Sequence, residues 1–182
     1  MKQLSRFEWQ GGGRDEWYTP AEAVKPILKH LKPGAKVLCP FDTPESNFVK
    51  ILTKNGFKVI HSHISEGKDF FKLEKPDVDY IISNPPFSKR EEVLMKLYEW
   101  QIPFAMILNE SGLFDSRQRS GVVKKYGAEI MYLYPRVKYI GEQGKNGSAP
   151  FQSVYWCYKI LPEKLMLEII QEDTGQMRLE GL

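Results

Sequence analysis

The sequence predicts an α/β fold built on a single doubly wound, mostly parallel sheet. Short apolar runs alternate with amphipathic segments along the chain, which is the pattern of strand–helix–strand units. A length of 182 residues suits one domain with a sizeable core. The balance of 42% hydrophobic and 27% charged residues is typical of globular proteins. No internal repeat and no change of composition marks a second domain.

The ends of the chain differ from its centre. Gly11-Gly12-Gly13 lies in an N-terminal segment without hydrophobic periodicity, and the last residues of the chain are polar. We therefore expect a flexible N-terminus at 1–14, the folded domain at 15–172 and a polar tail at 173–182.

The first helix is predicted to begin at Thr19. Thr19-Pro20-Ala21-Glu22 has the pattern of a capping box with proline at the first helical position. Pro26 is expected to kink this helix, and Pro33-Gly34 is expected to end it.

The strands are predicted from short apolar runs rich in β-branched and aromatic residues and bounded by turn residues. Most of these runs lack strict alternation, as expected for strands that are buried on both faces. In chain order the expected strands are residues 36–39, 57–64, 79–83, 104–108, 130–134 and 153–160. A polar, glycine-rich stretch at 141–149 separates the last two strands.

The remaining helices are predicted from apolar spacing and from capping residues. Residues 46–55 carry apolar side chains on one helical face, and Gly56 is placed to close that helix. Ser88-Lys89-Arg90-Glu91 is a second capping box, for a helix to about Trp100. Further helices are expected over 115–126 and 162–171.

The net charge and the cysteine content indicate which cellular compartment and which partners suit the protein. Cys39 and Cys157 lie in separate apolar runs, so both are expected to be small buried hydrophobes in a reducing cytoplasm. The net charge of +3 permits nucleic-acid binding without requiring it. No apolar run approaches the roughly 20 residues that a membrane-spanning helix needs, and residues 1–10 do not resemble a signal peptide.

In doubly wound sheets, ligands bind beyond the carboxyl ends of the strands at the point where strand order reverses. Asn84-Pro85-Pro86-Phe87 directly follows the strand at 79–83. Pro86 holds Pro85 extended, so the Pro85 carbonyl points in a fixed direction. The Asn84 side-chain oxygen is a second acceptor, and Phe87 adds a flat apolar face. A planar group bearing an NH₂ suits these features; a simple proline-rich turn is the alternative.

The tetrad resembles the catalytic motif of S-adenosylmethionine-dependent amino-methyltransferases, including the adenine-N6 DNA enzymes. The same tetrad, ending in Phe or Tyr, occurs in RNA methyltransferases and in enzymes that methylate protein glutamine. The resemblance spans most of residues 15–160 and is strongest to small phage-type adenine methyltransferases. It implies a Rossmann-like methyltransferase fold with an antiparallel last strand and S-adenosyl-L-methionine as cofactor. It also implies adenine N6 of DNA as the target, in the cytoplasm of a bacterial or phage-infected cell.

Three segments resemble the elements by which this family contacts its cofactor. The segment after the first strand keeps Pro40-Phe41, but residues 42–46 replace the usual Gly-x-Gly turn. The second strand ends without the acid that many relatives present to the ribose. Thr19 is expected near the methionine carboxylate, and Asp69 and Phe70 near the adenine, with a helix cap and core packing as the plainer alternatives. The predicted cofactor-binding residues are Trp17, Tyr18, Thr19, Pro20, Pro40, Phe41, Asp42, Ser46, Asp69 and Phe70.

The substrate side carries a basic run and a segment that resembles the family element lining the target-base pocket. Phosphate contacts by these cations would make binding salt-dependent, whereas a solvated charged face is the alternative. The predicted substrate-binding residues are Arg117, Arg119, Arg136, Lys138, Tyr139 and Lys145. His61 and His63 share one face of a strand, but the sequence offers no third ligand, so no metal site is expected.

Three functions remain open. The leading one is adenine-N6 methylation of DNA, which requires extrusion of the base from a duplex. The chain has little room for a separate recognition region, so relaxed specificity, a partner or a different substrate is also compatible. The second is methylation of RNA or of a protein glutamine by the same tetrad. The third is a degenerate, non-catalytic fold that binds nucleic acid or protein, which the missing glycines and ribose acid favour. Neither target sequence nor oligomeric state follows from the sequence.

Overall fold

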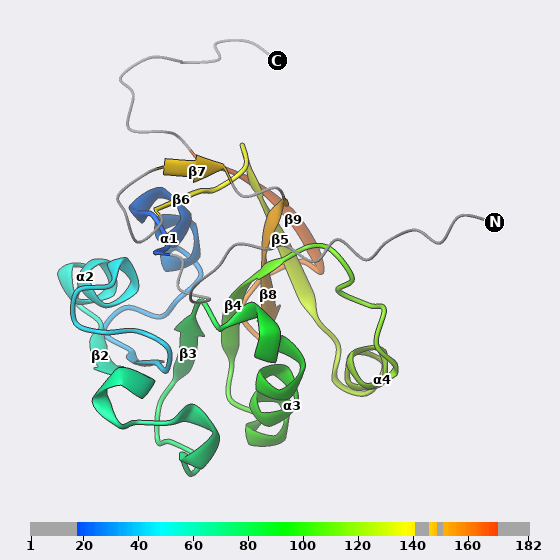
Figure 1. Ribbon diagram of the computed structural model, residues 1–182, viewed down its shortest axis with the longest axis horizontal. Coiled ribbons are helices and arrows are strands. Elements are labelled where there is room, and N and C mark those ends of the chain that lie inside the picture. Colours follow the sequence, from blue (N-terminus) through cyan, green and yellow to red (C-terminus); the bar gives the residue numbers. More distant parts are fainter. Residues whose placement is uncertain (1–17, 141–145, 149–150, 171–182) are drawn as a thin grey trace.

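The computed structural model describes residues 18–140, 146–148 and 151–170. They form a seven-stranded sheet with helices on both faces, and a separate two-stranded hairpin (Figure 1). The strands are β1 (Lys36–Cys39), β2 (Lys58–His61), β3 (Tyr80–Ser83), β4 (Phe104–Asn109), β5 (Glu129–Tyr134), β6 (Lys138–Ile140), β7 (Asn146–Ser148), β8 (Ser153–Tyr158) and β9 (Leu165–Ile169). The α-helices are α1 (Ala21–Leu28), α2 (Asn47–Lys54), α3 (Arg90–Trp100) and α4 (Arg117–Tyr126). Short 3-10 helices are η1 (Ile64–Glu66), η2 (Phe70–Lys72) and η3 (Phe87–Lys89).

The strand order in the large sheet is β2-β1-β3-β4-β8-β5-β9. β1 pairs in parallel with both β2 and β3, and β3 pairs in parallel with β4. β8 runs antiparallel to its two neighbours, β4 and β5. The winding of the chain reverses between β1 and β3, which makes their carboxyl ends the switch point of the sheet. This arrangement confirms the predicted doubly wound, mostly parallel sheet with an antiparallel strand at 153–158.

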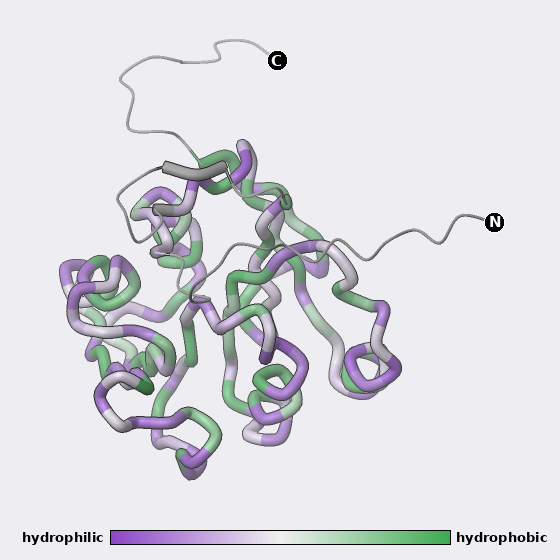
Figure 2. The backbone as a smooth tube through the Cα atoms, in the orientation of Figure 1, coloured by the Kyte–Doolittle hydropathy of each residue, from purple (hydrophilic) through white to green (hydrophobic). Residues whose placement is uncertain are grey.

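Two apolar layers hold the helices against the sheet. One layer joins α1 and α2 to inward side chains of β1, β3, β4, β5 and β8. The other layer joins α3 and, at its margin, α4 to the opposite face of the sheet. Figure 2 shows hydrophobic residues running through the central strands β3 and β4. Cys39 and Cys157 are free, buried members of the first layer, and burial raises the pKa of both thiols well above the usual range.

The C-terminal helix predicted at 162–171 is wrong. The chain instead forms β9, which pairs in parallel with β5 at the outer edge of the sheet. Leu165, Leu167 and Ile169 are exposed, whereas Met166 packs against the first apolar layer. Exposure that alternates every second residue is typical of a strand with one covered face. The sequence did not reveal the alternation, because apolar residues occupy both faces of this strand.

The N-caps of α1 and α3 are Pro20 and Lys89, and not the predicted Thr19 and Ser88. α1 begins at Ala21 after Pro20, and no side chain caps its first turn. α3 begins at Arg90, and Ser88 lies inside the 3-10 turn η3 that leaves the tetrad. The rigid prolines lead into a tight 3-10 turn before the helix, so Ser88 lies one residue before the N-cap of α3. The second strand is shorter than predicted because the chain turns away after His61 into η1.

A buried carboxylate fixes the turn from β8 to β9. Glu129 accepts hydrogen bonds from the backbone N–H groups of Lys159 at 3.1 Å, Ile160 at 2.9 Å and Leu161 at 2.9 Å. Lys159 adopts a left-handed conformation with φ of 56°, which the side chain from the neighbouring strand stabilises. Glu129 therefore sets the position from which β9 returns to the sheet edge. Within the described residues, no helix combines the length and apolarity that a membrane crossing requires.

Candidate active site

The two motifs singled out in the sequence leave the sheet side by side. Residues 40–42 follow β1, and residues 84–87 follow β3. β1 and β3 are paired in parallel, with Leu38 opposite Ile81, so both segments emerge at the same edge. The switch point of the sheet therefore lies between the Pro-Phe turn and the Asn-Pro-Pro-Phe tetrad, as predicted.

The tetrad connects a fully buried strand to a solvent-facing turn. Asn84 is half-buried, Pro85 is buried, and Pro86 and Phe87 are partly exposed. The Lys89 N–H donates to the Pro86 carbonyl at 3.0 Å, which closes the 3-10 turn before α3. The backbone direction at Asn84 is therefore determined from both sides, by β3 and by the prolines.

An aromatic contact that was not predicted holds Phe87. Its ring meets the edge of Phe151, with centroids 5.3 Å apart and an interplanar angle of 88°. Phe151 also contacts Tyr139, with centroids 6.3 Å apart. Edge-to-face pairs of this kind fix ring orientation as well as burying area. Phe151 lies 64 residues from Phe87 in the chain, so its role depends on the sheet topology and not on a local motif.

Asp42, predicted to contact the cofactor, points into the protein. Its carboxylate accepts a hydrogen bond from the Ser83 hydroxyl. Its backbone N–H donates to the Ser62 carbonyl at 3.1 Å. Burial raises the pKa of Asp42 to about 6, and the two serine hydroxyls oppose that rise. The carboxylate is therefore engaged by a protein group, and its contact with the cofactor stays a prediction.

The segment before α1 is anchored to α2. Thr19 and Pro20 are buried, and the Tyr18 side chain is 49% exposed. The Asn47 side-chain amide donates to the Thr19 carbonyl at 2.8 Å. Sequence reasoning missed Asn47, because its partner is a backbone group 28 residues away. Trp17, another predicted cofactor contact, lies outside the described residues.

The segment at 69–71 is packed into the core. Asp69 accepts a hydrogen bond from the Phe71 N–H at 3.0 Å and so caps η2. The Phe70 ring is only 3% exposed and lies between Phe41 and Trp100, with centroids at 4.8 and 5.3 Å. Core packing, the plainer alternative, is therefore what the structure shows for Phe70. Phe41 is partly exposed and follows the end of β1.

The end of β2 carries an unsatisfied polar group. Among the described residues, the buried Nδ1 of His61 has no hydrogen-bond partner. It lies 3.7 Å from a carboxylate oxygen of Glu66, a residue of η1. His63 instead caps η1, where its ring accepts from the Ser65 N–H at 3.2 Å. The two histidines thus have separate surroundings, and the described part of the chain contains no group of three or more potential metal ligands.

Of the predicted substrate-binding residues, three are exposed cations: Arg117, Arg136 and Lys138. Lys145 lies outside the described residues. Tyr139 is fully buried and its hydroxyl shares a 2.9 Å hydrogen bond with Ser153. Burial raises the pKa of Tyr139 to about 12. Its place in the core corrects the prediction that its side chain contacts substrate.

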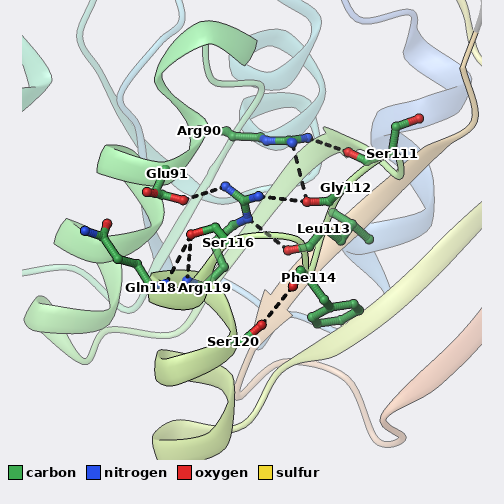
Figure 3. A network of polar contacts seen from close by, with 10 residues as sticks. All are labelled: Arg90, Glu91, Ser111, Gly112, Leu113, Phe114, Ser116, Gln118, Arg119 and Ser120. Carbon is green, nitrogen blue, oxygen red and sulfur yellow. Dashed lines mark hydrogen bonds and ion pairs between the residues drawn. The ribbon is translucent and has the colours of Figure 1, made fainter. Parts of the chain in front are cut away.

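Arg119 also has a structural position instead of the predicted phosphate contact. Its side chain is buried, and its guanidinium group donates to the carbonyls of Leu113 at 2.9 Å and Gly112 at 2.8 Å. The same group forms an ion pair with Glu91 of α3 at 2.7 Å. Figure 3 shows this guanidinium between the loop carbonyls and the glutamate. Arg119 is thus a buried cation that stabilises the loop between β4 and α4.

Together, the side chains in Figure 3 fix the loop between β4 and α4. Arg90 donates to the Ser111 carbonyl at 2.7 Å, and the Ser120 hydroxyl donates to the Phe114 carbonyl at 2.8 Å. With Arg119, these donors satisfy four successive backbone carbonyls, at 111–114. Because Arg90 begins α3 directly after the tetrad, the network ties this loop to the tetrad's own helix.

Comparison with known proteins supports the fold. No protein-family model matches the chain, and no curated protein sequence is significantly similar to it. A dimethyladenosine transferase from Plasmodium falciparum has a similar structure, with a TM-score of 0.53 and 14% identity over 79% of this chain and 62% of its own. A type I restriction-modification methyltransferase subunit from Streptococcus thermophilus has a TM-score of 0.49 and 14% identity over 84% of this chain and 46% of its own. The chain thus spans about half to three fifths of these proteins. Its sheet has the Rossmann-like methyltransferase fold.

Replacement of Arg119 by Met is expected to lower the free energy of unfolding by about 3 kcal/mol, because it leaves loop carbonyls and Glu91 without their donor. Limited proteolysis should become faster at residues 110–116. Arg117→Met is the matched control on the exposed side of the same helix turn and should change stability by no more than about 0.5 kcal/mol. Equal stability of the two variants in urea unfolding would contradict the stabilising role assigned to Arg119.

The buried carboxylate predicts a pH dependence. Because the folded-state pKa of Asp42 is raised to about 6, the folded protein holds this proton over a pH range in which the unfolded chain has lost it. The ionised carboxylate therefore destabilises the fold above about pH 6, and this cost is relieved as the pH falls toward 4. Relative to Asp42→Asn, the wild type should gain about 2 kcal/mol between pH 7 and pH 4. Urea unfolding of both proteins across this range would measure it; a constant difference would refute it.

Proposed function

We propose that this protein binds S-adenosyl-L-methionine at the switch point and transfers its methyl group to the exocyclic N6 of adenine in DNA. The observation that supports the proposal most is the position of the tetrad. It lies at the carboxyl end of β3, beside the Pro-Phe turn that follows β1. Fold and motif are independent observations, and they agree on the same edge of the sheet.

The residues around the switch point suit such a cofactor. S-adenosylmethionine supplies a methyl group activated by a positively charged sulfur. The buried segment at Thr19 and the partly exposed Phe41 flank the strand ends on which the cofactor would lie. At the end of β2, the unsatisfied His61 Nδ1 and the nearby Glu66 carboxylate offer polar partners to the hydroxyls of a ribose. Asp42 and Phe70 support the site from within.

The chemistry of the tetrad follows from its acceptors. The Asn84 side-chain oxygen and the Pro85 carbonyl would accept hydrogen bonds from the two hydrogens of an NH₂ group. Such bonds favour a pyramidal nitrogen, whose lone pair is then free to attack a methyl group. Fixed dipoles that stabilise the developing charge act as electrostatic preorganisation, so no strong base is needed before the attack. Phe87, held by Phe151, would provide the face on which the planar target stacks.

DNA is the proposed partner. Arg117, Arg136 and Lys138 are exposed cations, and those near the site would contact backbone phosphates. RNA and protein glutamine are alternative targets that the same tetrad serves in the resembling enzymes. The likeness to a dimethyladenosine transferase extends to the fold alone at 14% identity, so the choice of adenine rests on the tetrad. A non-catalytic binding module is the remaining alternative.

The test of catalysis is Asn84→Ala. Loss of one preorganised acceptor is expected to lower the rate of methyl transfer to an adenine-containing DNA by about 10²–10³-fold. Asn84→Asp keeps an acceptor of similar reach and should be milder. Transfer is measured with radiolabelled cofactor, and thermal unfolding is measured on the same preparations.

The controls separate the alternatives. Calorimetry should show that wild type and Asn84→Ala bind S-adenosylmethionine with similar affinity. Near-normal transfer by Asn84→Ala would refute the mechanism. Transfer to RNA or to a glutamine peptide, with none to DNA, would refute the DNA target. Absence of cofactor binding by the wild type would leave the non-catalytic module.

Binding to DNA predicts a measurable salt effect at α4. Arg117→Gln should lower the slope of log K against log salt by about one, because one phosphate contact is lost. Lys54→Gln, at the exposed end of α2, is the control and should leave the slope unchanged. Fluorescence anisotropy with a labelled duplex at several salt concentrations measures both. An unchanged slope for Arg117→Gln would show that Arg117, at the start of α4, does not contact a DNA phosphate.

A further inference from the structure

We propose that Asp42 is a positioning residue that holds the tetrad in register with the cofactor loop through its hydrogen bond to Ser83. This inference rests on the proposed function, and it assigns Asp42 a role different from direct ligand contact. Its side chain and its backbone bond the chain at the ends of two neighbouring strands, β3 and β2.

The first part of the argument is the connectivity of Asp42. Its carboxylate accepts from the hydroxyl of Ser83, the last residue of β3. Its backbone N–H donates to the Ser62 carbonyl just beyond β2 at 3.1 Å. Asp42 itself follows β1. One residue therefore joins the ends of three adjacent strands.

The second part is the location of Ser83 relative to the chemistry. Ser83 is completely buried and is directly followed by Asn84. A hydrogen bond at the Ser83 side chain fixes the rotation of the strand end from which Asn84 projects. Enzymatic rates depend strongly on such placement, since a displacement of about 1 Å can lower a rate by about 10²-fold. Ser83 thus links the anchor to the proposed catalytic acceptor.

The third part is the cost of a carboxylate at this position. Asp42 is buried, and the titratable groups whose pKa values it helps to raise, Cys39 and Tyr155, are themselves buried and neutral. No cation contributes to its stabilisation among the described residues. A buried charge without an opposite charge is expensive, so a neutral side chain would serve better if only packing were needed. The hydrogen bond that joins the end of β1 to the end of β3 accounts for the carboxylate.

The fourth part is the loop that follows. Residues 42–46 stand where the resembling family has a glycine turn, and a glycine turn is shaped by backbone freedom alone. Here the turn is shaped by side chains: the Ser46 N–H donates to the Thr43 carbonyl at 3.0 Å, and Ser46 caps α2. Asp42 anchors one end of this turn to β3. The hydrogen bond between Asp42 and Ser83 therefore fixes one end of a turn that glycines would leave flexible.

The experiment uses Ser83→Ala, Asp42→Asn and the double variant in the full chain. The matched control is Ser62→Ala, which removes another buried hydroxyl at the same edge, one that bonds the Pro40 carbonyl at 3.3 Å and not the Asp42 side chain. The measurements are kcat and KM for DNA methylation, the Kd for S-adenosylmethionine by calorimetry, thermal unfolding, and hydrogen exchange at the Asn84 and Phe87 amides.

Ser83→Ala is expected to lower kcat about tenfold while KM for DNA and the cofactor Kd stay within about threefold. The double variant should be no slower than Ser83→Ala, because Ser83→Ala already removes the bond, whereas Asp42→Asn keeps a side-chain oxygen that can accept it. Exchange at Asn84 should accelerate in Ser83→Ala and remain unchanged in Ser62→Ala. A structural role alone would lower the unfolding temperature without this split between kcat and KM.

Failure of this inference and failure of the proposed function are distinguishable. If Asn84→Ala is inactive but Ser83→Ala and Asp42→Asn keep the wild-type kcat, the anchor is refuted and the function stands. If Asn84→Ala retains transfer, the function is refuted, whatever the anchor variants do. If the wild type methylates none of the substrates, hydrogen exchange at the Asn84 amide still tests whether Asp42 and Ser83 position the tetrad. Unchanged exchange at Asn84 in both anchor variants would overturn the anchor, and faster exchange would support it.

Discussion

Neighbouring parallel strands deliver their carboxyl ends to one edge of a sheet, and in this protein β1 and β3 are such neighbours. Everything proposed about function depends on this pairing. It brings residues 40–42 and 84–87 together although some forty positions separate them in the chain. The same pairing places Ser83 within reach of Asp42, so the bond that joins the two motifs is a consequence of the sheet register.

The two sides of the site are stabilised by different kinds of interaction. On the side of β1 and β2, polar side chains fix backbone segments, as Asn47 does for Thr19 and Asp42 for its loop. On the side of β4 and α4, two arginines hold the loop at 111–113 through its carbonyls. The tetrad lies between these regions, and its ring is oriented by an aromatic neighbour. Rigid supports of this kind are what a preorganised site requires.

Much of the fold could be predicted because local signals and tertiary structure agreed. The strand at 36–39 is a short apolar run between turn residues, and β1 has these bounds. The tetrad was located because its chemistry is local to four residues. The rest depended on partners distant in the chain. The sequence shows that Arg119 is charged but not that Glu91 and the loop carbonyls surround it. At β9 an apolar run suited a helix and a strand equally, and pairing with β5 decided between them.

The burial of both cysteines has a practical consequence. Cys39 ends β1 and Cys157 lies in β8, and both belong to the layer under α1 and α2. A thiol that is covered and has a raised pKa reacts slowly with alkylating reagents, because thiolate is the reacting form. The rate of alkylation in the native protein therefore reports how often this layer opens. Cys39 adjoins the Pro-Phe turn, so the protein carries an intrinsic reporter of local opening beside its own switch point.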